Sequence, residues 1–183
     1  MKEKTKTTRG KIILRILLTA LCALVYAWIF SNSAKTGAQS STQSYTVTKT
    51  VQKVAGVIAP ESAIATASGD ALDRLHNAIR TLAHFYEFAL LGALLVWCYF
   101  SYTKDKSFAF LPFALILLTP IFDETVQSFT SGRVAEIADL FVDTAGGLAG
   151  CLFAFITVFI GGWIGKKRRK KKEEREKTLC KTV

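Results

Sequence analysis

The chain has 183 residues, of which 50% are hydrophobic, with a formal net charge of +10 and a mean hydropathy of +0.29. Three apolar runs, residues 12–30, 83–102 and 140–164, exclude an ordinary soluble domain, because about 20 apolar residues cross a bilayer core of roughly 30 Å. The four cysteines show no zinc spacing, and none lies in a segment predicted to face outward, which excludes a disulfide framework.

The first apolar run, residues 12–30, follows a basic segment and precedes small polar residues, a pattern that a cleaved signal peptide shares. Its 19 residues exceed the apolar region of about 7–15 residues in a usual signal peptide. The run therefore predicts a membrane anchor that stays in the protein.

Residues 31–82 are expected outside the membrane. The stretch SNSAKTGAQSSTQS at 31–44 is small and polar, which predicts a flexible segment. Apolar residues recur at helical spacing over residues 47–58 and predict a short amphipathic helix that Pro60 ends. A second amphipathic stretch, with Asp70 at its N-cap, runs without a breaker into the second apolar run, which predicts one long helix entering the membrane.

A fourth apolar run, residues 108–122, is too short to span and needs extension, so we expect a span over residues 107–127. The extension draws in Asp123 and Glu124. Pro120 should loosen the helix just before them, because proline removes a helix hydrogen bond. These carboxylates are therefore expected at the membrane edge, facing the helix bundle.

The charge distribution predicts the orientation. Residues 1–15 carry six basic side chains and one acidic one, net +5, and residues 166–183 carry ten basic and three acidic, net +7. The positive-inside rule places both ends in the cytoplasm, which requires an even number of crossings. The predicted fold is all-α: an integral membrane bundle of four transmembrane helices, with an extracytoplasmic amphipathic helical segment between spans one and two. Residues 1–165 form the membrane domain and residues 166–183 a basic cytoplasmic tail.

The tail begins KKRRKKKEER, a composition that nucleic-acid-binding patches share. Directly after a hydrophobic helix it is better explained as a topology anchor that contacts anionic lipid. We therefore expect anionic lipid at the tail and no nucleic-acid partner.

Polar residues of the predicted spans gather at the outer end, apart from Arg15 and scattered threonines. Clustered ionisable groups in a membrane fold are functional candidates by default. We expect Glu124 and Gln127 to line one wall of an outer-facing pocket, and Asp139 and Asp143 the opposite wall. Gly132 would permit a tight turn that brings an arginine over the pocket. Four further residues are interpreted as structural or water-facing: Asp123, Glu136, His76 and Asp73.

Three motifs follow one another in the chain: HFYEFALLG at 84–92, DETVQSFTSGR at 123–133 and EIADLFVDTAGGLAG at 136–150. Together with FSNS at 30–33, their order and spacing resemble the VanZ-like family of bacterial integral membrane proteins, over most of residues 12–160. The family is associated with low-level resistance to glycopeptide antibiotics such as teicoplanin. The resemblance implies a multi-pass protein of the bacterial cell membrane, connected with the cell envelope and with glycopeptide resistance.

The resemblance carries the family's positions onto His84, Glu87, Glu124, Gln127, Arg133, Asp139, Asp143 and Gly146. Two residues depart from the family pattern: Ser131 stands where proline is common, and Asp143 where asparagine is common. The candidate catalytic residues are Glu124, Glu87, Asp139 and Asp143. The candidate substrate-binding residues are Arg133, His84, Gln127 and Arg80. No metal site and no cofactor are predicted, because the arginine argues against a cation and no ligand spacing is diagnostic.

Three functions remain open, and the sequence does not decide whether the protein is an enzyme. The first is an enzyme that acts on a membrane lipid or a lipid-linked cell-envelope precursor, with Arg133 holding phosphate or carboxylate and Glu124 or Glu87 as general acid or base. The alternative is a non-catalytic accessory protein that binds an anionic headgroup or the antibiotic. A third is a structural protein in which Arg133 merely neutralises a carboxylate. Transport is disfavoured, because the polar residues stop at one end.

Overall fold

The computed structural model describes residues 2–103, 105–134 and 136–179, with side chains for residues 9–103, 105–134 and 136–174. Within these ranges the chain forms α-helices and no β-strand. The helices are α1 (Lys2–Ser33), α2 (Gly37–Ile58), α3 (Asp70–Tyr102), α4 (Leu111–Ser128) and α5 (Ile137–Leu179). The predicted all-α class is confirmed for this part of the chain. The last four residues of the predicted tail, including Cys180, lie outside it.

Three helical segments are long and apolar enough to cross a membrane: Arg9–Ser33, Asp70–Tyr102 and Ile137–Glu174. They coincide with the three long apolar runs of the sequence. α4 has 18 residues and is not among the three. The chain is thus an all-helical protein with three candidate membrane spans in the described residues.

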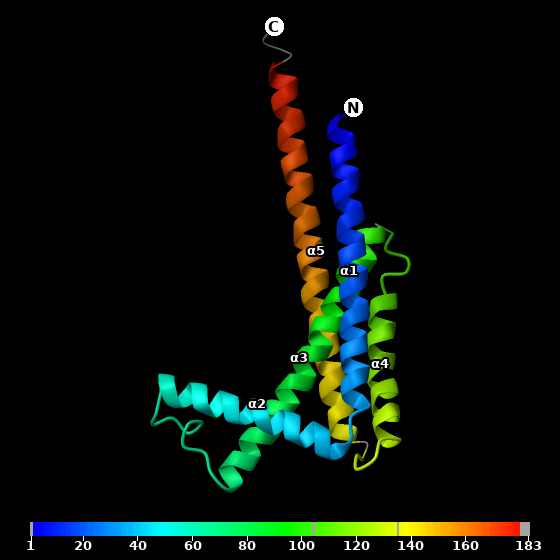
Figure 1. Ribbon diagram of the computed structural model, residues 1–183. Coiled ribbons are helices and arrows are strands. Elements are labelled where there is room, and N and C mark those ends of the chain that lie inside the picture. The colour runs from blue at the N-terminus through cyan, green and yellow to red at the C-terminus, as the bar shows by residue number, and fades with distance from the viewer. Residues whose placement is uncertain (1, 104, 135, 180–183) are drawn as a thin grey trace.

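α1, α4 and α5 lie lengthwise in the molecule, α3 crosses them obliquely, and α2 lies across the bundle (Figure 1). Both chain termini are at one end, which we call the basic end because the basic segments lie there. The end of α1, the start of α5 and the α4–α5 turn lie at the opposite end, which we call the polar end. α2 packs on α3 through the hydroxyl groups of Ser44 and Thr48, which lie 3.3 and 3.5 Å from the ring nitrogens of His76.

α3 and α5 share the most extensive helix contact, and glycines allow it. A Cβ atom added to Gly146 would lie 2.2 Å from the carbonyl oxygen of Phe85, and one added to Gly150 would lie 1.8 Å from that of Ala89. On the α3 side, a Cβ on Gly92 would lie 2.2 Å from the carbonyl oxygen of Gly147. The predicted packing of the glycine face of α5 against another helix is therefore confirmed, and α3 is its partner.

The expected flexible segment at 31–44 is wrong, because a helix begins within it. Thr36 accepts a hydrogen bond from the backbone of Gln39, and the Gln39 side chain accepts one from the backbone of Thr36. This capping box satisfies two backbone donors at the start of α2 and lets the helix begin at Gly37. α2 ends at Ile58, as the position of Pro60 predicts.

α4 begins at Leu111, after residue 107, where the third span is expected to start. The Asp105 carboxylate accepts hydrogen bonds from both the backbone and the hydroxyl of Ser107, at 2.9 and 2.8 Å. This local turn competes with helix for the same donors. Pro112 lies in the first turn of α4, where proline is tolerated, and Pro120 lies inside the helix.

At the basic end, Arg15 of α1 is satisfied by the end of α3. Its Nε donates to the carbonyl oxygen of Ser101 at 2.9 Å, and its guanidinium lies 5.2 Å from the ring centre of Tyr102. The last carbonyls of a helix lack partners within the helix and favour a nearby cation. Away from both ends, the apolar core is made by residues of α1, α3, α4 and α5: Ile29, Phe88, Leu91, Ala93, Val96, Ile116, Cys151 and Ala154.

Candidate functional site

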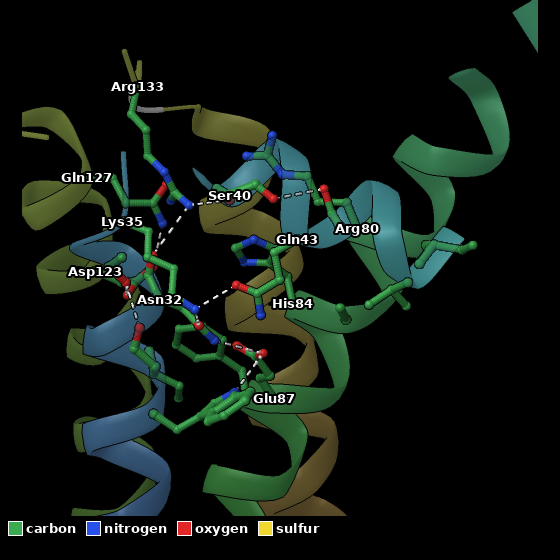
Figure 2. A pocket seen from close by; sticks show the side chains of 18 residues that line it. Asn32, Lys35, Ser40, Gln43, Arg80, His84, Glu87, Asp123, Gln127 and Arg133 are labelled. Atoms are coloured by element: carbon green, nitrogen blue, oxygen red, sulfur yellow. Dashed lines mark hydrogen bonds between the residues drawn. The ribbon is translucent and has the colours of Figure 1, made fainter. Parts of the chain in front are cut away.

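A cavity of about 210 Å³ opens at the polar end, between α1, α2, α3, α4 and the α4–α5 turn. Figure 2 shows Arg133 at the top of this cavity and Glu87 at the bottom. Its polar lining comprises Asn32, Ser33, Lys35, Ser40, Gln43, Ser44, Arg80, His84, Glu87, Asp123, Gln127 and Arg133. Five of the eight candidate site residues therefore line one cavity: Glu87, Arg133, His84, Gln127 and Arg80.

The end of α1 holds the Glu87 carboxylate. Trp28 Nε1 donates to Glu87 Oε1 at 3.0 Å, and Asn32 Nδ2 donates to the same oxygen at 3.4 Å. These two donors fix the side chain without a cation. Glu87 is thus a half-buried carboxylate at the floor of the cavity, with its charge not balanced by a direct ion pair among the described side chains.

Asp123 is fully buried and joins α1 to α4. Ser33 donates its hydroxyl to Asp123 Oδ1, and Gln127 Nε2 donates to Asp123 Oδ2 at 2.7 Å. Gln127 thereby holds the carboxylate one helical turn before it. Of the two interpretations given for Asp123, structural or water-facing, its 1% exposure excludes the second, and its hydrogen bonds between α1 and α4 agree with the first.

The predicted wall of Asp139 and Asp143 is wrong in its geometry, since neither residue belongs to the lining. Arg80 Nη2 lies 3.0 Å from Asp139 Oδ2, and His84 Nδ1 lies 3.2 Å from Asp143 Oδ1. Both aspartates are buried behind the α3 side chains that do line the cavity. α5 therefore orients the cavity residues of α3. A chemical role for the two aspartates stays a prediction.

Glu124 is also displaced from the predicted wall. Its Oε2 accepts a hydrogen bond from the backbone of Glu136 at 3.0 Å, which anchors the chain just before α5. Its Oε1 is buried without a hydrogen-bond partner among the described residues. α4 turns Asp123 rather than Glu124 toward the cavity, so Asp123 takes the place in the lining that the sequence predicts for Glu124.

Two cations of the cavity, Arg133 and Lys35, form hydrogen bonds to neutral groups. Arg133 Nη2 donates to Ser40 Oγ at 2.5 Å and to the carbonyl oxygen of Asn32 at 3.4 Å. Lys35 Nζ donates to Asn32 Oδ1 at 2.8 Å and to Gln43 Oε1 at 2.6 Å. Neither cation lies within 4.0 Å of a carboxylate oxygen in the described part of the chain, so the structure does not have the direct ion pair by which Arg133 would neutralise a carboxylate in the structural alternative.

Burial lowers the pKa of the Arg133 guanidinium below its ordinary value, and the positive charge of Arg80 lowers it further. The negative charges of Asp123, Asp139 and Glu124 act on this pKa in the opposite direction and offset the lowering only in part. The arginine keeps its charge, as arginines do in proteins. A bound anion would add a further negative charge that favours the charged form. The cavity therefore contains a cation whose charge is incompletely compensated by the protein.

The α4–α5 turn holds Arg133 against α2. Gly132 has a φ of 73°, the left-handed conformation that glycine adopts most easily, as the predicted tight turn requires. Gly37 N donates to the carbonyl oxygen of Ser131 at 3.1 Å, and a Cβ atom on Gly37 would lie 2.0 Å from the carbonyl oxygen of Gly132. Two glycines thus bring the turn and the start of α2 into contact, directly beside Arg133.

The contribution of α2 and of the α1–α2 link to the cavity was not predicted. Lys35, Ser40 and Gln43 line the cavity, although their segment was expected to be flexible. The T-x-x-Q sequence at 36–39 is a capping-box signal that predicts a helix start there. From that start, helical spacing places Ser40, Gln43, Ser44 and Val47 on one face.

The chemistry available at the cavity is anion binding together with one acid–base group. Three cationic side chains, Lys35, Arg80 and Arg133, lie above Glu87 in the view of Figure 2. His84 and Asp123 are each engaged by neighbouring side chains. Within the described side chains, no three His, Cys, Asp or Glu residues are grouped as a metal ion requires.

A family model described as VanZ/LLP1 matches residues 17–159, which is most of the chain. No curated protein and no solved structure matches this chain. The matched region contains α2, α3 and α4 whole, together with every residue that lines the cavity. The chain therefore belongs to the VanZ/LLP1 family.

Proposed function

We propose that the cavity recognises the phosphate or carboxylate of a membrane lipid or lipid-linked cell-envelope precursor, and that Glu87 performs general acid–base chemistry on the bound group. The site lies at the outer face of the bacterial cell membrane in this proposal. The observation that carries it is the pair of cations, Lys35 and Arg133, that face the cavity without a direct carboxylate partner among the described residues.

The arrangement of donors supports an anionic ligand. Arg133 presents a planar guanidinium, which can bind two oxygens of a phosphate or carboxylate at once. Lys35 adds a point charge, and Ser40 of α2 accepts a hydrogen bond from Arg133 through its hydroxyl oxygen. An anion bound here would replace hydrogen bonds to neutral groups by stronger hydrogen bonds to a charged one.

The size of the cavity supports a small polar group over an entire glycopeptide antibiotic. Its volume of about 210 Å³ is below the range of roughly 300–1,000 Å³ in which drug-sized ligands bind. A lipid headgroup could enter it while the hydrocarbon part stays in the membrane. We therefore propose that the implied link to teicoplanin resistance arises because the protein modifies or binds a component of the cell envelope, and not because it binds the antibiotic.

The acid–base role falls to Glu87 because the other carboxylates are engaged or outside the lining. Asp123 accepts from Ser33 and Gln127, and Asp139 pairs with Arg80. Glu87 is held through one oxygen by neutral donors, so it can exchange a proton without breaking an ion pair. Of the two carboxylates that the sequence offers for this role, Glu124 and Glu87, the proposal takes Glu87.

A non-catalytic binding protein is the second candidate function. It is favoured by the extent of the hydrogen-bonded network, in which both oxygens of Asp123 are occupied. A site with few free acid–base groups can bind an anionic headgroup without transforming it. The two candidates differ in Glu87: the enzyme needs its carboxylate to exchange a proton, and the binding protein does not.

The proposed placement in the membrane has four crossings, with α4 as the additional span and both termini cytoplasmic. It is supported by the basic segments at the two chain ends, which lie at the same end of the bundle. Lys106 in the α3–α4 link lies there too, as the same rule requires. The basic tail would contact anionic lipid, and α2 would cover the outer face.

The binding proposal is tested with the purified full-length protein and a polyprenyl phosphate, compared with the neutral polyprenol of the same length. We expect the wild type to bind the phosphate and to discriminate against the alcohol. Arg133→Lys should weaken phosphate binding by about tenfold or more, because lysine lacks the two-pronged geometry. Arg74→Lys is the matched control, since Arg74 is exposed on α3 outside the cavity.

Equal binding of the phosphate and the alcohol by the wild type would reject anion recognition at this site. If Arg133→Lys binds and melts like the wild type, the arginine serves only as a neutralising charge and the proposed grip is wrong. The melting temperature of each variant, measured without lipid, separates loss of binding from loss of fold.

A further inference from the structure

We propose that a second groove, at the basic end, is a selective binding site for an anionic phospholipid, with its phosphate on Lys106, Lys166 and Arg169 and one acyl chain between α3 and α5. The inference uses the proposed membrane placement but none of the residues of the polar-end cavity. It goes beyond general attraction of the tail to lipid, because it assigns a defined site. The occupant is a phospholipid of the membrane leaflet at that end.

The groove exists because the contact between α3 and α5 changes character along its length. Near the polar end, glycines bring the two backbones together at Gly146 and Gly150. Farther along, aromatic side chains meet instead: the ring centres of Phe100 and Phe155 are 6.0 Å apart, and those of Trp97 and Phe153 are 6.2 Å apart. Large side chains hold the helices apart, and a hollow of about 630 Å³ follows.

The groove is apolar along its length and basic at its mouth. Phe100, Phe155 and Phe159 contribute aromatic surface, and Phe159 is 64% exposed. Lys106 comes from the α3–α4 link, whereas Lys166 and Arg169 lie three residues apart on α5 and so share a face of the helix. Three cations from two parts of the chain thus converge where the apolar wall ends.

The combination matches a phospholipid at its own depth in the membrane. α5 is apolar up to Gly165 and basic directly after it, so the groove mouth falls at the level of lipid headgroups. Trp163 lines the groove at that level, where tryptophan is favoured at membrane interfaces. Arg169 contacts Glu173 at 3.4 Å, but both side chains are largely exposed, and such a pair gives way readily to a phosphate.

Two adjacent glycines of α5 supply a sharp test. A Cβ atom at either Gly161 or Gly162 meets no atom within 4 Å, so both positions accept a larger side chain without a clash. Only Gly162 lines the groove. Gly162→Leu should therefore fill the hollow, whereas Gly161→Leu changes the same helix equally and leaves the hollow open.

The full-length protein, purified in neutral detergent, is titrated with phosphatidylglycerol and with phosphatidylcholine of the same chains, and lipid binding is measured by native mass spectrometry. We expect the wild type to prefer phosphatidylglycerol, Gly162→Leu to lose that preference by about tenfold, and Gly161→Leu to keep it. If Gly162→Leu and the wild type bind phosphatidylglycerol equally, the groove is not the site.

A charge comparison separates the groove from the rest of the tail. The triple variant Lys106→Gln, Lys166→Gln, Arg169→Gln should lose the preference. The control triple Arg168→Gln, Lys170→Gln, Lys171→Gln removes equal charge outside the groove lining and should keep most of it. Equal losses in both triples would mean that the tail attracts lipid without a site. Competition by glycerol phosphate at millimolar concentration would indicate a free-phosphate site and overturn the assignment of a lipid.

Discussion

Glu87 differs from the other carboxylates of the polar end in how it is held. Two neutral donors from α1, Trp28 and Asn32, bind the same oxygen and keep the side chain in place. A glutamine could accept both hydrogen bonds through its own carbonyl oxygen, so the fold does not require the charge. The proposed acid–base function does require the carboxylate, because Glu87 must exchange a proton with the bound group.

Glu87→Gln should therefore keep the wild-type melting temperature and keep or strengthen binding of a polyprenyl phosphate, because a negative charge is removed near an anion. An acid–base residue contributes typically about 100-fold or more to a rate, so under the proposed function the variant should fail to restore the envelope lipid profile of a deletion strain. Glu61→Gln, at an exposed position between α2 and α3, is the control. Full restoration by Glu87→Gln at equal protein abundance favours the non-catalytic binding protein.

At the level of single residues, the sequence predicts the candidate site residues better than it predicts their positions in the structure. Periodicity places His84 and Glu87 on one face of α3, and the structure keeps them together in the lining. It does not give the rotation of a helix about its own axis. In α4 that rotation turns Asp123 inward and leaves Glu124 beside the chain before α5, a choice that depends on packing against α1 and α5.

Among the helix pairs, α3 and α5 depend most on small residues. At Gly146 the Phe85 carbonyl occupies the place of a side chain, and backbone cannot move aside as a flexible side chain can. Gly146→Leu should destabilise the protein by about 1–3 kcal/mol or more through overpacking, and lower both its melting temperature and its abundance in the membrane. Gly161→Leu, in open space on the same helix, should leave both unchanged.

If Gly146→Leu melts like the wild type, the two helices do not approach as closely as the structure has them. The helix pair itself could be predicted only in part. The glycine spacing in α5 indicates a close contact, and the structure supplies the identity of the partner and the matching glycine of α3 at Gly92. The partner depends on how all the helices are arranged, which local sequence does not determine.

For the whole molecule, hydrophobic runs and charge predict most of the arrangement. Three long apolar runs become three long helices, and the two basic chain ends lie together in the structure. Hydrophobicity predicts only residues 47–58 of the helix across the polar end, because α2 begins in a polar stretch and is held by caps and by hydroxyl contacts with α3. Its start, together with the α1–α2 link, brings Lys35, Ser40 and Gln43 to the site.

Whether α4 crosses the membrane determines the topology, and labelling can decide it. α4 is the shortest helix of the lengthwise set; it lies beside α1 and α5 and runs from the polar end to the level of the α3–α4 link, beyond which α1 and α5 continue (Figure 1). In a variant without native cysteines, single cysteines at 45 and 131 should react with an impermeant maleimide applied to intact cells. Cysteines at 105 and 178 should react only after the cells are opened. The decisive pair is 105 and 131, which flank α4: equal reactivity from outside would mean that α4 does not cross, and reaction at 178 in intact cells would reverse the predicted orientation of the tail.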